Sequence, residues 1–303
     1  MQTLKQKIHY WCPDTTSGTI TGKGVCVAIL DTGMALHPDL KYRIVGWKDM
    51  VQKKRSPYDD NGHGTHVAGI LAGDGRSSHR MMVGMAPRAD LIAVKVLNQK
   101  GDGRISDVIG GIQYILREQK RYKIRVVNIS IGTAPHAGNE DEKKLVYWVD
   151  RLWDAGMVVI TAAGNMGPGE GSITLPGNSK KVITVGSCLK NTSEVQQEKS
   201  AFSYSGCGPT GECIAKPDVT APGTGIYSCN YRYPYQSNMP YLKKSGTSMA
   251  TPVVSGCTAL LLEKYPDMKN VEVKMHLWES CEDLGFPQNK QGHGLIHVGK
   301  LLQ

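Results

Sequence analysis

The sequence lacks several features that would define other classes of protein. It has no apolar run long enough to span a membrane, so no membrane partner is expected. It has no internal repeat and no low-complexity tract, which excludes repeat architectures and compositionally biased segments. It has no Cys-x-x-Cys pair, so the usual ligand spacing of a structural zinc site is missing. What remains is the sequence of an ordinary globular protein.

The first 24 residues have no continuous apolar core and include Lys5 and Lys7, which is unlike a secretory signal. We therefore expect a cytoplasmic protein in which most of the eight cysteines stay reduced. Export would instead permit disulfides. In that case Cys207 and Cys213, which bracket a Gly-Pro-Thr-Gly turn, would be the first pair to examine.

Length and charge narrow the remaining possibilities. With 303 residues, 40% of them hydrophobic, the chain can form one large domain; we expect an N-terminal extension over residues 1–24 and a domain over residues 25–303. The net charge of +9 would suit a nucleic-acid partner. However, the basic residues occur in short scattered groups without interleaved aromatic residues, which favours a solvated surface and no nucleic-acid partner. Nothing in the sequence defines an oligomeric state.

Short apolar runs rich in β-branched residues alternate with helical patterns along the chain. Such runs are typical of strands buried on both faces of a sheet. The expected strands cover residues 25–30, 91–96, 125–131, 158–162 and 182–185. Apolar residues recur at helical spacing over residues 105–116, 145–153 and 247–265. The alternation predicts a single-domain α/β fold: a doubly wound, mostly parallel sheet with helices on both faces and functional residues at the carboxyl ends of its strands.

The segment Gly246-Thr247-Ser248-Met249-Ala250-Thr251-Pro252 delivers one serine to the start of the last of these helices. Pro252 is tolerated there because it falls within the first turn. A helix N-terminus presents unpaired backbone N–H groups that stabilise negative charge, as acyl transfer requires. Ser248 is therefore a candidate nucleophile, although a serine at this position could also be an ordinary helix cap.

A serine nucleophile needs a histidine base and an orienting carboxylate. Asp31 ends the first apolar run, and His63 lies within the stretch NGHGTHVAG. Each residue alone has an ordinary structural interpretation, but the chain order Asp, His, Ser is that of subtilisin and predicts a catalytic triad. Asp31-Thr32-Gly33 also spells the aspartic-protease signature. That chemistry needs a second such carboxylate, which the sequence does not contain.

At these segments the sequence resembles the subtilisin-like serine proteases. The motifs VAILDTG, HGTHVAG and GTSMATP occur in the family's order, and HPDL, GMAPRADLIAVKVL, NISIG, AAGN and KPDVTAPG extend the resemblance over nearly the whole chain. YDDNGHGTH and GKGVCVAILDTG are most similar to the intracellular alkaline subtilisins of bacilli. The resemblance implies a serine endopeptidase that cleaves polypeptides without a required cofactor, in intracellular protein turnover or peptide processing. A catalytically silent relative that binds peptides or regulators is the alternative.

The resemblance also implies roles for individual residues. Ser248 would attack the scissile carbonyl group, His63 would accept its proton, and Asp31 would orient the imidazole. The Asn165 side chain and the backbone N–H of Ser248 would form the oxyanion hole. The remaining substrate-binding residues would be Gly101, Asp102, Gly103, Ser130, Ile131 and Gly132 along the peptide, and Ala163, Gly164 and Thr174 at the primary pocket.

Three residues bear on what the resemblance implies about the primary pocket and about metal binding. Thr174 stands where many subtilisins have a glycine at the pocket floor, which predicts a moderately sized apolar pocket. Asp39 matches a calcium ligand of secreted relatives, but the loop over residues 74–82 carries arginine and histidine, so structural calcium is possible rather than required. His66 follows His63 by three residues and could suggest a metal pair. No third ligand is at hand, so packing is the favoured role.

Two further features leave the substrate open. Asp59, Asp60 and Asp102 would favour basic side chains before the scissile residue if they lie near the substrate, or else they form a solvated acidic loop. The tyrosine-rich stretch over residues 227–241 would grip a substrate or partner, or else it packs as a surface loop.

Overall fold

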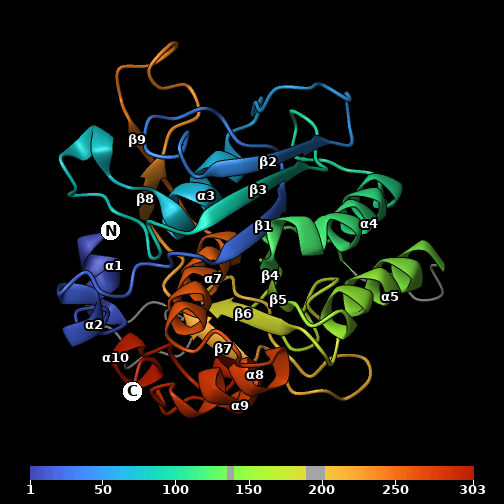
Figure 1. Ribbon diagram of the computed structural model, residues 1–303. Coiled ribbons are helices and arrows are strands. Elements are labelled where there is room, and N and C mark those ends of the chain that lie inside the picture. The colour runs from blue at the N-terminus through green and yellow to red at the C-terminus, as the bar shows by residue number, and fades with distance from the viewer. Residues whose placement is uncertain (135–139, 189–201) are drawn as a thin grey trace.

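Seven parallel strands form the central sheet of the protein. A computed structural model describes residues 1–134, 140–188 and 202–303. The strands lie in the order β2-β3-β1-β4-β5-β6-β7 (Figure 1). Their bounds are Cys26–Asp31 (β1), Ile44–Asp49 (β2), Asp90–Lys95 (β3), Ile124–Ile129 (β4), Val158–Ala162 (β5), Ile183–Ser187 (β6) and Val219–Ala221 (β7). All six pairings within this sheet are parallel, and the predicted α/β fold is confirmed.

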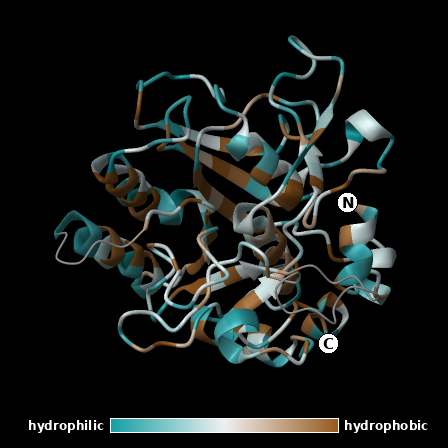
Figure 2. Ribbon diagram, turned by 180° about the vertical axis from the view of Figure 1, so that it is seen from behind, coloured by the Kyte–Doolittle hydropathy of each residue, from teal (hydrophilic) through white to brown (hydrophobic). Residues whose placement is uncertain are grey.

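The inner strands are buried on both faces, as their apolar sequences require. Every residue of β1, β5 and β6 is buried, and so is every residue of the short edge strand β7, whereas β2 at the opposite edge mixes buried, half-buried and exposed positions. Figure 2 shows the hydrophobic residues concentrated in the strands and the hydrophilic residues toward the periphery. Helices must therefore cover both faces of the sheet, because a parallel sheet exposes neither face to water.

Two pairs of helices supply this cover. On one side α3 (His63–Ala72) packs against α7 (Thr247–Lys264), and α7 also contacts β4, β5 and β6. On the other side α4 (Ile105–Tyr122) packs against α5 (Glu140–Asp154) (Figure 1). The shorter helices are α1 (Gln2–Lys7), α2 (Pro13–Thr16), α8 (Asn270–Glu279), α9 (Gln288–Gln291), α10 (Val298–Leu301) and the 3-10 turn η1 (Arg76–Ser78).

A two-stranded antiparallel hairpin lies outside the main sheet. Its strands, β8 (Ile226–Cys229) and β9 (Tyr241–Lys244), pack against α3. The hairpin carries most of the tyrosine-rich stretch and leads directly into the serine turn before α7. The sequence patterns predicted none of β2, β7, β8 or β9.

The N-terminal residues are part of the packed structure. Leu4, Ile8 and Tyr10 belong to the main hydrophobic core, and the Tyr10 hydroxyl donates to the carbonyl oxygen of Met85 at 2.8 Å. The division at residue 24 stays a prediction. Among the described residues, no helix combines the length and the apolar character that crossing a membrane requires.

The winding of the sheet reverses at β1. This strand pairs with β3 on one side and with β4 on the other, although β4 follows β3 in the sequence. The loops that leave β1 and β4 therefore diverge and open a crevice at the carboxyl edge of the sheet. Asp31 ends β1, and residues 130–132 follow β4 at this edge.

We predict that Gly256→Ala in α7 destabilises the protein, although alanine forms helices better than glycine. A Cβ at Gly256 would lie 2.4 Å from Cβ of Met85, so the overpacking cost of about 1–3 kcal/mol should exceed the helix gain of about 1 kcal/mol. Gly110→Ala in α4 is the matched control. Its Cβ would meet only the flexible end of Met50 at 2.5 Å, and the free energy of unfolding should stay equal or rise. Urea unfolding measures both; equal gains would contradict the prediction.

Candidate active site

Asp31 and His63 are joined at the carboxyl end of β1. Asp31 is the last residue of the strand and is 1% exposed. Nδ1 of His63 lies 2.8 Å from Oδ1 and 2.9 Å from Oδ2 of Asp31. The backbone N–H of Thr32 also donates to Oδ1, at 2.7 Å. Because an ionised carboxylate only accepts hydrogen bonds, Nδ1 carries the proton and Nε2 keeps a lone pair.

A glycine after the histidine allows this close approach of α3 to β1. His63 is the first residue of α3, and Gly62 before it has φ +95°. A Cβ at Gly64 would lie 2.1 Å from the carbonyl oxygen of Gly33 and 3.1 Å from Oδ1 of Asp31. Any side chain there would push the helix away and separate the imidazole from the carboxylate.

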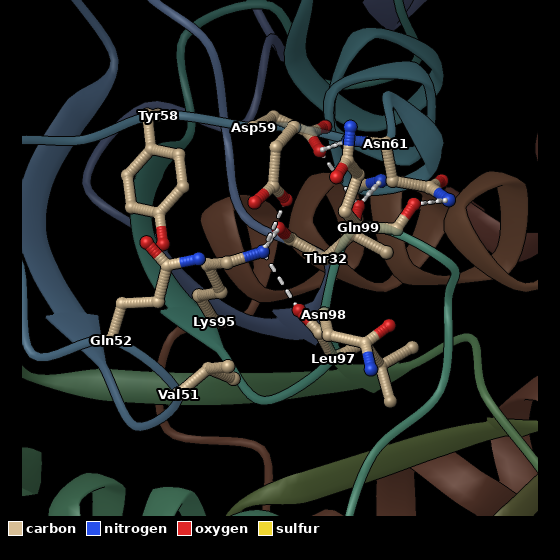
Figure 3. A network of polar contacts seen from close by, with 12 residues as sticks. Thr32, Val51, Gln52, Tyr58, Asp59, Asn61, Lys95, Leu97, Asn98 and Gln99 are labelled. Carbon is tan, nitrogen blue, oxygen red and sulfur yellow. Dashed lines mark hydrogen bonds and ion pairs between the residues drawn. The ribbon is translucent and has the colours of Figure 1, made fainter.

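Asp59 holds the loop that leads into α3 (Figure 3). Its Oδ1 accepts hydrogen bonds from the Thr32 hydroxyl at 2.9 Å and from the N–H groups of Asn61 at 3.1 Å and Gly62 at 2.8 Å. Its Oδ2 accepts from the N–H and hydroxyl groups of Thr65, at 2.9 and 2.6 Å. Asp59 is 8% exposed, so its carboxylate serves the fold rather than a substrate.

Lys95 ties three segments of the site together, and its side chain is fully buried (Figure 3). Its Nζ donates to the carbonyl oxygen of Thr32 at 2.5 Å, to Oδ1 of Asp60 at 2.7 Å and to the carbonyl oxygen of Leu97 at 2.7 Å. These acceptors belong to the loop after β1, the loop before α3 and the segment that leads to residues 101–103. Asp60 is thereby paired. Of the three acidic residues noted in the sequence, only Asp102 lines the cavity described below.

Ser248 is the second residue of α7 and lines the same cavity as His63. In the part of the chain that the structure describes, no hydrogen bond joins its Oγ to Nε2 of His63. Such bonds are often long in unliganded sites and tighten when substrate binds. The helix start supplies backbone N–H groups beside the hydroxyl, as the sequence predicts.

Asn165 is oriented by the residue before Ser248. Its Oδ1 accepts hydrogen bonds from the backbone N–H of Thr247 at 2.9 Å and from the Thr247 hydroxyl at 3.1 Å. These two donors fix which end of the amide is oxygen, so Nδ2 remains available as a donor. Asn165 lines the cavity together with Ser248.

A cavity of about 850 Å³ brings the predicted site residues together. His63, Asn165 and Ser248 line it, and so do eight of the nine predicted substrate-binding residues. These eight are Gly101, Asp102, Gly103, Ser130, Ile131, Gly132, Gly164 and Thr174. Apolar side chains that include Leu97, Ile129, Leu145, Val149 and Leu175 form much of the wall.

Thr174 closes the cavity between two glycines. A Cβ at Gly132 or at Gly164 would lie 2.4 Å from the Thr174 hydroxyl oxygen, so the backbone of both segments contacts this side chain. Ala163, the remaining predicted residue, does not line the cavity. It is fully buried, and its carbonyl oxygen accepts the N–H of Thr174 at 2.9 Å. Ala163 therefore lies behind the wall of the cavity, and its role in binding substrate stays a prediction.

Glu142 lines the cavity although the sequence did not single it out. It lies in α5 and is 6% exposed. In the sequence it is the third residue of the acidic run Glu140-Asp141-Glu142, which resembles a solvated first turn of a helix. Only the packing of α5 against α4 and the sheet turns this carboxylate toward the site, so no sequence signal identified it.

The surroundings of Asp39 do not suit calcium. Its Oδ1 accepts the N–H of Ser77 at 2.8 Å, and its Oδ2 accepts the Tyr241 hydroxyl at 2.6 Å. The side chains that could share a metal ion with it are those of His37, whose Nδ1 lies 3.8 Å from Oδ1, and Cys229. Calcium prefers six to eight oxygen ligands, and this set offers nitrogen and sulfur instead.

Neither the cysteines nor His66 adds chemistry to the site. Cys207 is buried and Cys213 is exposed, and no disulfide joins the two. His66 is fully buried, and its Nε2 contacts the carbonyl oxygens of Ile226 and Leu242 at 3.1 and 3.2 Å. His66 thus joins α3 to the hairpin, which is the packing role expected for it.

The tyrosine-rich stretch packs against the histidine loop. A Cβ at Gly62 would lie 2.2 Å from the ring of Tyr231, so this ring covers the residue before His63. Tyr233 and Tyr241 lie near His37, with ring centroids 5.4 and 6.0 Å away. Tyr235 is 89% exposed. The stretch is therefore anchored at one side and free at its tip.

Neighbouring charges determine the pKa of His63. Burial lowers the pKa of the imidazole, but the charge and hydrogen bond of Asp31 raise it by more, so the pKa lies above its ordinary value. The positive charge of Lys244 opposes this rise. Lys244 ends β9, four residues before Ser248, whereas its neighbour Lys243 is exposed.

The sequence was compared with known proteins. The profile of the subtilase family matches residues 22–294. Serine protease AprX of Bacillus subtilis (strain 168) is 44% identical over 268 residues, which cover 84% of this chain and 61% of AprX. Subtilisin Savinase of Lederbergia lenta is 35% identical over 279 residues, which cover 92% of this chain and 91% of Savinase. The solved structure of Sphericase aligns with a TM-score of 0.78 at 29% identity and 92% coverage of both chains.

Fold and comparisons together define the class of this protein as that of the subtilisin-like serine hydrolases. The chain belongs to the subtilase family. It spans about three fifths of the length of AprX and nearly all of Savinase. The resemblance to subtilisin-like proteases is confirmed, while the specific roles of the site residues and a cytoplasmic location stay predictions.

We predict that Lys244→Met raises the pKa of His63, because the substitution removes a positive charge that disfavours the imidazolium ion. Lys243→Met is the matched control and should leave the pKa of His63 unchanged. Proton NMR titration of the His63 ring measures both, in a Ser248→Ala background that prevents self-digestion. Equal shifts in the two variants, or a lower pKa in Lys244→Met, would contradict this arrangement of charges.

Proposed function

We propose that this chain is a serine endopeptidase that hydrolyses polypeptides with an Asp31-His63-Ser248 triad. The observation that carries the proposal is the double contact of His63 Nδ1 with both oxygens of Asp31, at the mouth of a cavity that Ser248 also lines. Membership of the subtilase family supports the same reading. A silent relative that only binds peptides would also have this fold, so the proposal requires a direct test of Ser248.

The reaction proceeds through an acyl-enzyme. Ser248 Oγ attacks the scissile carbonyl carbon while Nε2 of His63 takes the hydroxyl proton. Asp31 stays ionised, keeps the proton of the imidazole on Nδ1 and stabilises the cation that forms. His63 then passes the proton to the leaving amine. Water, activated by the same imidazole, attacks the ester and releases the second product.

Two donors stabilise the tetrahedral intermediate. The backbone N–H of Ser248 lies at the start of α7, where no intrahelical acceptor exists for it. Nδ2 of Asn165 is the second donor, because Thr247 occupies the other end of the amide. Both groups are held in place before the charge develops, which is the condition under which such donors accelerate a reaction most.

The substrate binds in extended form along two backbone segments. Residues 101–103 and 130–132 line the cavity and offer main-chain groups that pair with any peptide sequence. Thr174 limits the depth of the primary pocket, and its apolar walls favour medium-sized apolar side chains. This recognition suits protein turnover or peptide processing. Buried cysteines such as Cys26 and Cys257, which pack in the core as small apolar side chains, suit a reducing, cytoplasmic location.

Labelling with a fluorophosphonate tests the nucleophile. We expect the wild-type protein to form one stoichiometric adduct, because the probe reacts only with an activated serine. Ser248→Ala should lose the adduct entirely. Ser245→Ala, which alters an exposed serine three residues earlier, should keep it. A folded wild-type protein that takes up no label would instead be a silent, peptide-binding relative.

Substitution of Asn165 tests the oxyanion hole. We expect Asn165→Ala to lower kcat by about 10²–10³, or about 2.7–4 kcal/mol, with little change in KM; this magnitude is the one known from a subtilisin. Asn165→Asp is the informative partner, since it keeps an acceptor for Thr247 and removes the Nδ2 donor. Both variants should lose activity. If Asn165→Asp kept wild-type kcat, Asn165 would act only by anchoring Thr247.

A further inference from the structure

A second cavity shares no lining residue with the candidate active site. It has a volume of about 200 Å³ and lies where the segment before β7 meets α8 and α9. Its floor is formed by three charged side chains: Lys216, Lys274 and Asp218 are 1%, 8% and 5% exposed. Its mouth includes His293 and Gln288, which are exposed and leave the cavity open to solvent.

The floor of the cavity carries a net positive charge, because its two lysine amines share one carboxylate. Nζ of Lys216 lies 2.5 Å from Oδ2 of Asp218, and Nζ of Lys274 lies 3.2 Å from Oδ1 of the same carboxylate. Among the described residues, Asp218 is the only carboxylate that lines the cavity, which Lys180 lines as well, and the negative charge of Asp150 acts on Lys216 from outside the lining. Burial lowers the pKa of Lys216 to about 8, against the opposing effect of Asp218, so this amine remains largely protonated at pH 7. A buried net charge of this kind is costly without a counter-ion.

Two hydrogen-bond donors at this cavity also lack acceptors among the described residues. Lys274 is not one of these two donors, because its Nζ donates to the carbonyl oxygens of residues 180, 181 and 182 in addition to Asp218. Lys216 has only two acceptors for three hydrogens, the carbonyl oxygen of Val182 at 3.0 Å and Asp218. Nε1 of Trp278 is buried and has no acceptor, although the indole lines the cavity.

We propose that this cavity binds a small oxyanion of the phosphate or sulfate type. Such an ion supplies both missing elements, a negative charge for the lysine pair and oxygen acceptors for Lys216 and Trp278. Water would satisfy the donors but leave the charge uncompensated. His293 stacks on Trp278 with ring centroids 4.5 Å apart and offers a further polar edge at the mouth. The bound ion stabilises the folded state, because the unfolded chain has no such site.

Isothermal titration with phosphate tests the proposal on the Ser248→Ala protein, which cannot digest itself. We expect saturable binding and a Tm that rises with phosphate more than with chloride at equal ionic strength. Trp278→Phe keeps the stacked ring but removes the Nε1 donor, and should weaken binding about tenfold or more. Lys216→Met should abolish it. Trp148→Phe, in α5, is the control and should bind as the parent does.

Sulfate and acetate distinguish the source of the oxyanion. Stronger binding of phosphate and sulfate points to a free tetrahedral ion, and equal binding of acetate points to a carboxylate group of a peptide. The proposal is overturned if phosphate shows no saturable binding, if chloride raises the Tm equally, or if Trp278→Phe binds as tightly as its parent. Because Trp278→Phe retains the aromatic packing, it keeps the test decisive should Lys216→Met fail to fold.

Discussion

The reversal of winding at β1 is the constraint on which the active site depends. The strand is buried on both faces and paired on both edges, so its end cannot shift without disturbing the core. Asp31 is held at that end by its position in the sheet and by the N–H of Thr32. The divergence of the loops after β1 and β4 then leaves room at one edge for α3, for the start of α7 and for an extended peptide.

Buried lysine amines have complete hydrogen bonding at the candidate active site and incomplete hydrogen bonding at the cavity before β7. Lys95 has an acceptor for each of its hydrogens, and each acceptor comes from a different segment of the active site. The polar network there is complete, so it confers rigidity where atomic positions matter. Lys216 and Lys274 instead share the carboxylate of Asp218, and Lys216 has only two acceptors for its three hydrogens among the described residues. Buried lysine thus rigidifies the candidate active site in one place and forms part of a cluster with net positive charge in the other.

Much of the fold could be predicted because its central strands are buried on both faces and read as apolar runs. β2 escaped notice because it lies at the sheet edge and mixes exposed and buried positions, and β7 because it has only three residues. The candidate triad residues were named from the order of their motifs in the sequence. The lysine network, the amide orientation of Asn165 and the approach of Glu142 were not, because each depends on segments far apart in the chain. The position of Ala163 was not predictable either, because it lies next to cavity residues in sequence but behind them in space.

The contact of Tyr231 with Gly62 joins the β8–β9 hairpin to the loop that precedes His63. Because the ring fills the space into which a side chain at position 62 would project, the two positions cannot change independently. A relative with a bulkier residue before its histidine would have to redirect this ring, and the positive φ of Gly62 would favour glycine there as well. The ring and the residue preceding the histidine should therefore be inherited together as one unit of variation within the family.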